Sequence, residues 1–204
     1  MQIGDRVYRN FINFNYKVVD ENFCDQLAEY YNLNSKKTYD SRVATGDEKF
    51  PDGEIKKAER NSREFIPWGE GMMMKIRNIV NPLVEDYIQH YPEITASMQK
   101  NTWYEPAHIL KYEKSKDYYY NFHVDKFEKG GNDRIISIII YLNDVAEGGG
   151  TEFKYFEPSV IQPSKGSVLI FPSTSFWMHK GVAPISNEKL ICVSWLRNRD
   201  VVDG

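Results

Sequence analysis

The sequence predicts an α+β fold, an antiparallel β-sandwich or barrel braced by N-terminal helices. Apolar residues recur with helical spacing in the first part of the chain, and short β-rich runs separated by turn residues follow from Asn101 onward. The aromatic content of 14%, with 14 Tyr and 11 Phe, also suits a sheet-rich interior or a lined cavity.

The first predicted helix covers residues 20–33, with Asp20 as the candidate N-cap. Its apolar residues fall on one face: Phe23, Leu27, Tyr30 and Tyr31. Apolar residues recur at helical spacing again over residues 68–91, which predicts a second helix, and Pro82 lies within it. Because proline lacks a backbone N–H, we expect a kink or a restart there, with Asn81 as a second N-cap.

Residues 36–63, between these helices, are rich in charge, Gly, Asp and Pro and carry little periodic apolar signal. They are predicted to form a long exposed loop or lid, which is either a solvated insertion or a functional segment.

The strands are predicted from runs rich in β-branched and aromatic residues, punctuated by Gly148-Gly149-Gly150 and by Pro163-Ser164-Lys165-Gly166. These runs cover residues 109–112, 118–123, 134–142, 151–156, 168–171, 176–180 and 190–196. We expect residues 1–204 to form a single domain, with helical support and the lid in 1–100 and the β-rich part in 101–204.

Composition argues against several classes of protein. The 26 Lys plus Arg against 29 Asp plus Glu give a net charge of −3, so no nucleic-acid partner is expected. No apolar run approaches the roughly 18 residues that span a bilayer, and the N-terminus lacks an apolar secretory signal, so we expect a soluble, cytoplasmic protein without a membrane partner. Both Cys residues, Cys24 and Cys192, lie in apolar surroundings and are predicted to be buried thiols.

Two of the four histidines stand in contexts that suggest a metal. His123 and Asp125, in YNFHVDKF, are two residues apart at the end of a predicted strand and can turn to one face. His179, in FWMHKGV, lies on another predicted strand. Two imidazoles and one carboxylate form the ligand set of non-haem Fe(II) oxygenases, which leaves coordination positions for a cosubstrate and O₂. A zinc hydrolase uses a similar set.

Lys189 begins an apolar strand, KLICVSW, where an unpaired cation is costly to bury. An anionic ligand would satisfy it, and a keto acid such as 2-oxoglutarate could chelate the metal and place its distal carboxylate on this ammonium. A solvated cation at the start of a strand is the alternative.

From Ile109 to Arg197 the chain resembles the catalytic core of prolyl 4-hydroxylase-type Fe(II)/2-oxoglutarate dioxygenases. That family's pattern is present in order: Tyr112, His123, Asp125, Arg134 opening RIISIIIYLND, GGGTEF from Gly148, PSKG from Pro163, His179-Lys180-Gly181, Lys189 and Trp195. The resemblance implies a double-stranded β-helix, or jelly roll, which agrees with the predicted strands.

The resemblance also implies roles for individual residues. His123, Asp125 and His179 would bind iron. Lys189 would bind the 2-oxoglutarate distal carboxylate, helped by Tyr112, Thr151 and Tyr141. Three further residues match positions that face the prime substrate: Arg134, Tyr120 and Trp195. Trp195 could instead belong to the core and Arg134 could cap an edge strand, and Tyr120 is one of three adjacent tyrosines whose register the sequence does not fix.

The reaction implied is hydroxylation of an unactivated C–H bond, with O₂ as oxidant, release of succinate and CO₂, and ascorbate as the reductant. A carboxylate at Asp125 favours hydroxylation, because related halogenases carry a small residue there. The expected substrate is a prolyl residue in a peptide or protein. The alternatives are a free amino acid or other small molecule, a nucleic-acid demethylase, and a non-catalytic jelly-roll binding module.

Overall fold

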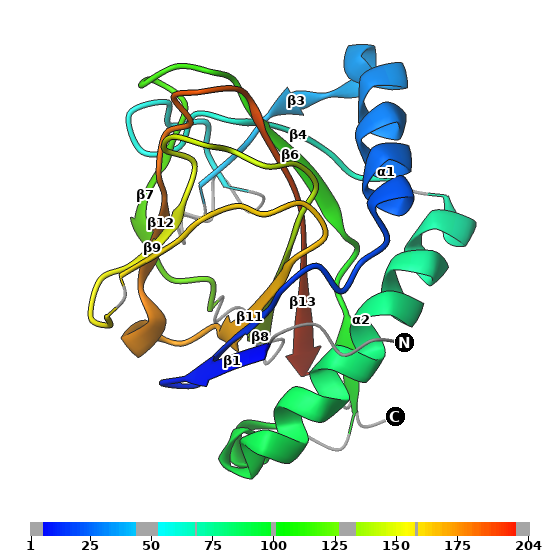
Figure 1. Cartoon of the computed structure of the whole chain (residues 1–204), viewed down its shortest axis with the longest axis vertical. Helices are drawn as coiled ribbons and strands as arrows, with labels where there is room; N and C mark the ends of the chain where they lie inside the picture. The colour runs from blue at the N-terminus through cyan, green and yellow to red at the C-terminus, as the bar shows by residue number, and fades with distance from the viewer. Residues whose placement is uncertain are drawn as a thin grey trace.

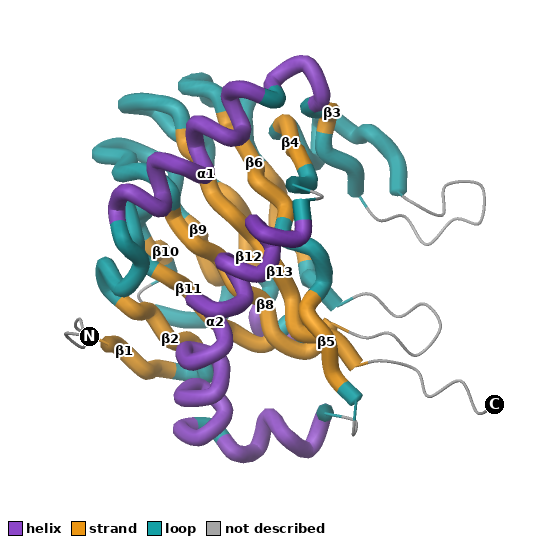
Figure 2. Tube along the Cα trace, turned by 90° about the vertical axis from the view of Figure 1, so that its right-hand side faces the viewer, coloured by secondary structure: helices purple, strands orange, loops and turns teal. Residues whose placement is uncertain are grey.

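Two antiparallel sheets face each other, and two helices cover the outer side of the larger sheet (Figure 1). The computed structural model describes residues 6–43, 53–67, 69–98, 101–126, 134–157 and 159–198. In Figure 2 the helices lie across the strands of the larger sheet, so three layers are stacked: helices, larger sheet and smaller sheet.

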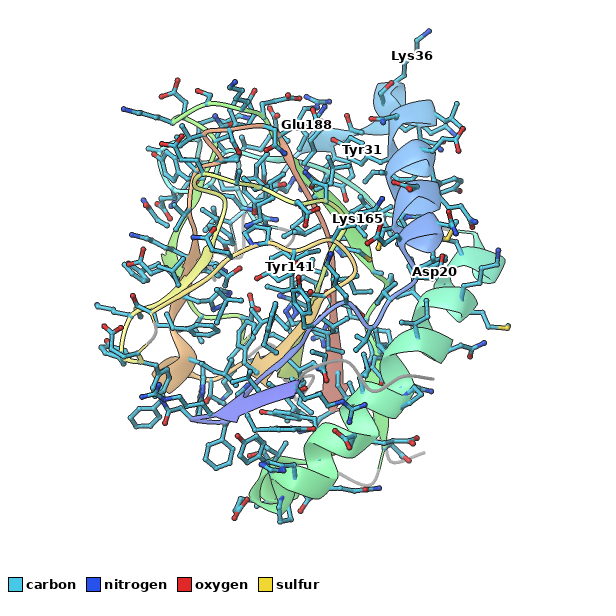
Figure 3. All side chains as sticks on the ribbon, in the orientation of Figure 1. Asp20, Tyr31, Lys36, Tyr141, Lys165 and Glu188 are labelled. Carbon is cyan, nitrogen blue, oxygen red and sulfur yellow. The ribbon has the colours of Figure 1, made fainter. Side chains whose placement is uncertain are left out.

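Helix α1 (Glu21–Leu33) begins where the sequence predicts, because the Asp20 carboxylate accepts hydrogen bonds from the backbone N–H groups of Asn22 and Phe23 (Figure 3). Its buried residues are Phe23, Cys24, Leu27 and Tyr31, which form the stripe facing the sheet.

Helix α2 (Glu70–His90) runs through Pro82 without a restart, so the predicted second N-cap at Asn81 is wrong. Tertiary contacts explain this: Val80, Leu83, Val84 and Tyr87 around the proline are all buried against the core. No helix in the described part of the chain is both long and apolar enough to cross a bilayer.

The larger sheet contains most of the strands. Their order is β1 (Arg6–Arg9), β2 (Ile12–Asn15), β11 (Val168–Pro172), β8 (Arg134–Tyr141), β13 (Lys189–Asn198), β6 (His108–Tyr112), β4 (Arg63–Phe65) and β3 (Tyr39–Asp40), with β5 (Thr102–Tyr104) also paired to β13. The order in the smaller sheet is β10 (Val160–Ile161), β9 (Thr151–Phe153), β12 (His179–Gly181) and β7 (Tyr120–His123).

Strand β13 shows how the layers form two cores. Leu190, Cys192 and Leu196 point to the helices, whereas Ile191, Val193 and Trp195 point to the space between the sheets. A strand covered on both faces is apolar on both, which is why this run reads as continuously hydrophobic rather than alternating. Figure 3 shows Tyr141 of β8 in the interior of the molecule. Cys24 and Cys192 are buried free thiols, as predicted.

The N-terminal hairpin of β1 and β2 was not predicted. Its turn places Asn10 and Phe11 at φ of 53° and 59°, whereas the usual sequence signal for such a turn is Asn-Gly. Strand β2 pairs with β11 and extends the larger sheet. The strand predicted over residues 176–180 is wrong in part. Ser175–Trp177 forms a 3-10 turn, and the strand begins only at His179.

The prediction of a long exposed loop over residues 36–63 is confirmed only in part, because short elements and backbone pairing interrupt the loop; residues 44–52 lie outside the described part. Residues 35–37 form a 3-10 turn, and β3 and β4 add to the larger sheet. Beyond them, Asn61 N donates to Tyr119 O, and Asn121 N donates to Glu59 O, both at 2.8 Å. The segment is therefore docked along the free edge of β7.

Gly148 offers a test of a tight turn in this fold. It has φ +72°, and a Cβ there would lie 2.2 Å from the Ala183 carbonyl oxygen. We expect Gly148→Ala to lower the free energy of unfolding by about 1–3 kcal/mol, measured by denaturant unfolding. The control is Gly71→Ala in α2, where nothing lies within 4 Å and alanine should stabilise the helix by up to about 1 kcal/mol. Equal effects of the two changes would contradict this account.

Candidate metal centre and its cavity

Two histidines face each other across adjacent strands of the smaller sheet. His123 ends β7 and pairs with His179, which begins β12, and their ring centroids are 4.3 Å apart. Each Nδ1 contacts a backbone carbonyl, that of Asn121 at 2.8 Å and that of Trp177 at 3.0 Å. A carbonyl at Nδ1 orients the ring and leaves Nε2 available as a ligand.

Asp125 joins this pair from the loop after β7. Its carboxylate oxygens lie 3.5 Å from His123 Nε2 and 3.8 Å from His179 Nε2. The three side chains offer ligand atoms within 4.8 Å of one another, the only such group among the described residues. The larger sheet holds the carboxylate, because Ser137 Oγ and Trp195 Nε1 donate to Oδ2 at 2.7 and 3.0 Å.

Electrostatics favour the protonation states that a metal needs. Burial, followed by the neighbouring His123, lowers the pKa of His179 to about 4, so this imidazole is neutral at pH 7. Burial alone would raise the pKa of Asp125, but the two imidazoles and Arg134 hold it well below its usual range. The neutral imidazole of His179 and the ionised carboxylate of Asp125, with His123 Nε2 beside them, therefore fit a divalent metal of the non-haem iron type.

Lys189 is the first residue of β13 and is 1% exposed. It lies on the interior face of the strand, with Nζ 5.3 Å from the centroid of the Tyr112 ring on β6. No carboxylate of the described residues pairs with it, and burial lowers its pKa to about 7. A buried cation without an anionic partner suits a site that receives an anion from solution.

A cavity of about 710 Å³ joins these groups. Its walls include nine of the ten residues that the sequence singles out: Tyr112, Tyr120, His123, Asp125, Arg134, Thr151, His179, Lys189 and Trp195. Tyr141 is the exception. It is fully buried, and its hydroxyl lies 2.8 Å from that of Thr151, so it contacts the wall rather than forming it.

The three residues expected to face a prime substrate lie at the metal end of the cavity. The Tyr120 ring stacks on His123, with centroids 3.5 Å apart. The Arg134 guanidinium lies 3.6 Å from the centroid of the Trp195 ring and donates to both carboxylate oxygens of Glu105. Trp195 also contacts Asp125 through its indole N–H, so it belongs to the metal centre as well as to the wall.

Three residues of the site were missed by the sequence analysis. Arg60 covers the outer face of Tyr120, with its guanidinium 4.6 Å from the ring centroid. Glu105 pairs with Arg134 and with Arg197. The sequence did mark Ser137, because it interrupts the isoleucine run from Ile135 to Ile140. Arg60 lies in a charge-rich segment with no pattern to mark it.

Residues 107–197 match the family model of the 2OG-Fe(II) oxygenase superfamily. A curated relative, prolyl 4-hydroxylase 1 of Arabidopsis thaliana, is 24% identical over 164 residues, which are 66% of this chain and 58% of the relative. The chain therefore spans less than two thirds of that relative's length.

Two solved structures share the fold. The viral collagen prolyl hydroxylase of Paramecium Bursaria Chlorella virus-1, in its 2OG complex, aligns with a TM-score of 0.68 at 19% identity, covering 93% of this chain and 97% of that one. A prolyl hydroxylase of Trichoplax adhaerens, in complex with a peptide fragment of hypoxia inducible factor, aligns with a TM-score of 0.65 at 16% identity. The alignment covers 92% of this chain and 83% of that one. The predicted jelly roll is confirmed.

The hydrogen bond from Ser137 to Asp125 gives a test of the metal centre. We expect Ser137→Ala to weaken Mn(II) binding about 10–100-fold, because the carboxylate loses one of the two donors that orient it. Equilibrium dialysis measures this. Ser194→Ala is the matched control, since it also removes a buried hydroxyl hydrogen bond, to Glu105 O, but leaves Asp125 untouched. Equal losses in both variants would contradict the role of Ser137.

Proposed function

We propose that this chain, whose residues 107–197 form a 2OG-Fe(II) oxygenase domain of the prolyl 4-hydroxylase type, hydroxylates a prolyl residue in a peptide or protein, with Fe(II) and 2-oxoglutarate. The observation that carries the proposal is the placement of His123, Asp125 and His179 around one point of a cavity that also contains the buried ammonium of Lys189.

His123, Asp125 and His179 are the proposed iron ligands, through two Nε2 atoms and the carboxylate. Bound iron would supply the oxygen chemistry that side chains lack, in which O₂ oxidises 2-oxoglutarate to succinate and CO₂ and one oxygen atom enters a C–H bond. The backbone carbonyls of Asn121 and Trp177 keep the imidazoles oriented. Ascorbate is the proposed reductant.

Lys189 is proposed to bind the distal carboxylate of 2-oxoglutarate. Tyr112 is its register partner on β6, and Tyr112 and Thr151 line the same cavity. Tyr141 acts through Thr151, because the hydrogen bond between their hydroxyls sets the direction of the Thr151 donor. The apolar wall of Ile191 and Val193 excludes water from this end of the cavity and strengthens the ion pair.

Tyr120, Arg134 and Trp195 are proposed to contact the prime substrate beside the metal centre. Glu105 holds the Arg134 guanidinium over the Trp195 ring and so positions it.

Cavity size favours a peptide over a free amino acid. At roughly 30 Å³ per non-hydrogen atom, the share of one liquid water, 2-oxoglutarate needs at most about 300 Å³ of the 710 Å³. The remaining space exceeds what one amino acid fills. The Trichoplax adhaerens relative in fold is described with a peptide bound.

The pKa of Lys189 gives a pH-dependent test. Because burial lowers this pKa to about 7, the free protein loses the ammonium proton as pH rises above 7, and the dianion then has no cation to meet. The Kd for 2-oxoglutarate in the presence of Mn(II) should rise by up to about tenfold per pH unit from pH 7.5 to 9, measured by calorimetry. Lys189→Met should bind about 10–150-fold more weakly at pH 7 and show a flat profile while Mn(II) still binds. A flat profile in the unchanged protein would remove Lys189 from this role.

The activity itself is tested by succinate release and by mass spectrometry of proline-containing peptides incubated with Fe(II), ascorbate and 2-oxoglutarate. We expect peptide-dependent succinate release and hydroxylated proline, both abolished by His179→Ala. Turnover of free proline with no turnover of any peptide would replace the peptide substrate by a small molecule. Undiminished succinate release by His179→Ala would contradict the ligand assignment.

A further inference from the structure

We propose that Arg60 is a positioning residue of the metal centre. It fixes the Tyr120 ring against the His123 imidazole, so that a proposed iron ligand is held by a side chain from outside the span 107–197 that matches the oxygenase family. The inference rests on the proposed function and deepens it, because it adds to the metal centre a residue that acts through another side chain.

The two histidines of the metal centre differ in what packs around them. His179 is 4% exposed, and the core rings of Phe153 and Phe171 lie 5.9 and 4.7 Å from its ring centroid. His123 ends β7, an edge strand of the smaller sheet, and its side chain is 15% exposed. The Tyr120 ring is stacked on the face of this imidazole, with an angle of 15° between the planes. The orientation of His123 therefore depends strongly on where the Tyr120 ring lies.

Arg60 covers the opposite face of the Tyr120 ring. The imidazole occupies one face at 3.5 Å between centroids, so the guanidinium, 4.6 Å from the Tyr120 centroid, lies on the other. Guanidinium, phenol ring and imidazole thus form a column of three groups. A cation over a ring face is attracted to it, so Arg60 favours the position in which Tyr120 lies flat on His123.

The guanidinium is itself held in place. Nη1 donates to Arg42 O at 2.8 Å, Nε to Ser62 Oγ at 3.3 Å and Nη2 to Glu64 Oε2 at 3.2 Å. Burial alone would raise the pKa of Glu64, but His108 and Arg60 lower it to about 2, so this partner is a carboxylate at pH 7. A planar group bonded through three of its nitrogen atoms keeps one orientation, unlike a long side chain on the surface.

Backbone pairing brings Arg60 and Tyr120 together. An isolated β-bridge joins the two residues, and the hydrogen bonds that dock this segment on the edge of β7 flank it. In Figure 1 the segment, in cyan, lies beside β7. A shift of one residue in this register would turn the side chain of Arg60 to the other face of the sheet. The contact with the Tyr120 ring is therefore specified by the fold.

The column has a consequence for metal binding. Outer partners that orient a ligating imidazole raise metal affinity, because less ordering is left to be done when the metal binds. Arg60 acts on His123 through the Tyr120 ring, so its effect on metal affinity must disappear when that ring is removed. A residue that merely stabilises its own segment would not show this dependence.

The test is a double-mutant cycle on Mn(II) binding, measured by equilibrium dialysis without 2-oxoglutarate or peptide. Arg60→Gln should raise the Kd for Mn(II) about 3–30-fold, the scale of one partly buried cation–π contact. Tyr120→Leu should raise it at least as much, whereas Tyr120→Phe keeps the ring and should leave it unchanged. In the Tyr120→Leu background, Arg60→Gln should change the Kd by less than about twofold.

The matched control is Arg63→Gln. It removes the same charge from a neighbouring position, but Arg63 contacts Asp40 and Thr38 rather than the Tyr120 ring, so the Kd for Mn(II) should stay unchanged. Circular dichroism checks that each variant is folded, and Arg60→Ala is measured beside Arg60→Gln as a second way of uncovering the ring.

A second readout needs no metal. Stacking on Tyr120 should shift the NMR signals of the His123 imidazole C–H groups upfield in the metal-free protein, because these protons lie over the face of an aromatic ring. Arg60→Gln should reduce this shift, and Arg63→Gln should leave it unchanged.

An unchanged Kd for Mn(II) in Arg60→Gln, or an equal effect of this substitution with and without the Tyr120 ring, would overturn the proposal. A raised KM for peptide with an unchanged Kd for Mn(II) would make Arg60 a substrate contact and would overturn it as well. Failure of the unchanged protein to bind Mn(II) would instead refute the proposed function, and the metal-free imidazole shift would still decide whether Arg60 holds the stack.

Discussion

The burial of ionisable groups between the two sheets is the constraint on which the rest of this structure depends. His123, Asp125, His179 and Lys189 line a cavity bordered by the apolar core between the sheets, where unpaired charges are costly. The two imidazoles donate hydrogen bonds to backbone carbonyls, and the Asp125 carboxylate accepts hydrogen bonds from Ser137 and Trp195. Lys189 has no such compensation among the described residues, and its pKa is lowered by burial alone. The cavity therefore favours a metal cation beside His123, Asp125 and His179 and an anion beside Lys189.

The two sheets contribute to this arrangement in different ways. The larger sheet, covered by α1 and α2, is apolar on both faces and supplies Lys189, Ser137 and Trp195 from its central strands. The smaller sheet supplies the two imidazoles. Asp125 lies in the gap between the sheets and contacts both, and its neighbour Lys126 donates its backbone N–H to Ser173 O at the end of β11. The distance between the sheets is thus fixed at the point where the ligands converge.

The N-terminal part of the chain provides more than support. Arg60 reaches the Tyr120 ring from a segment docked on the edge of β7, and Phe11 contacts the Trp177 ring from a turn in which it has φ +59°. Residues beside the metal centre and its cavity thus come in part from outside the span that matches the oxygenase family model. Such a division lets one metal centre serve different substrates through changes in the surrounding walls.

The sequence by itself determined the candidate ligands and most of the elements. A His-x-Asp pair at a strand end, a second His and a Lys opening an apolar strand are local signals, as are the helical period and the Asp20 cap. Only the tertiary structure decided which side chains meet. The register of β7 with β12 sets His123 opposite His179. Burial of the residues that flank Pro82 lets α2 continue through the proline. Backbone pairing with β7 brings Arg60 to the cavity. These outcomes depend on contacts between residues far apart along the chain, and periodicity and spacing report only on neighbours.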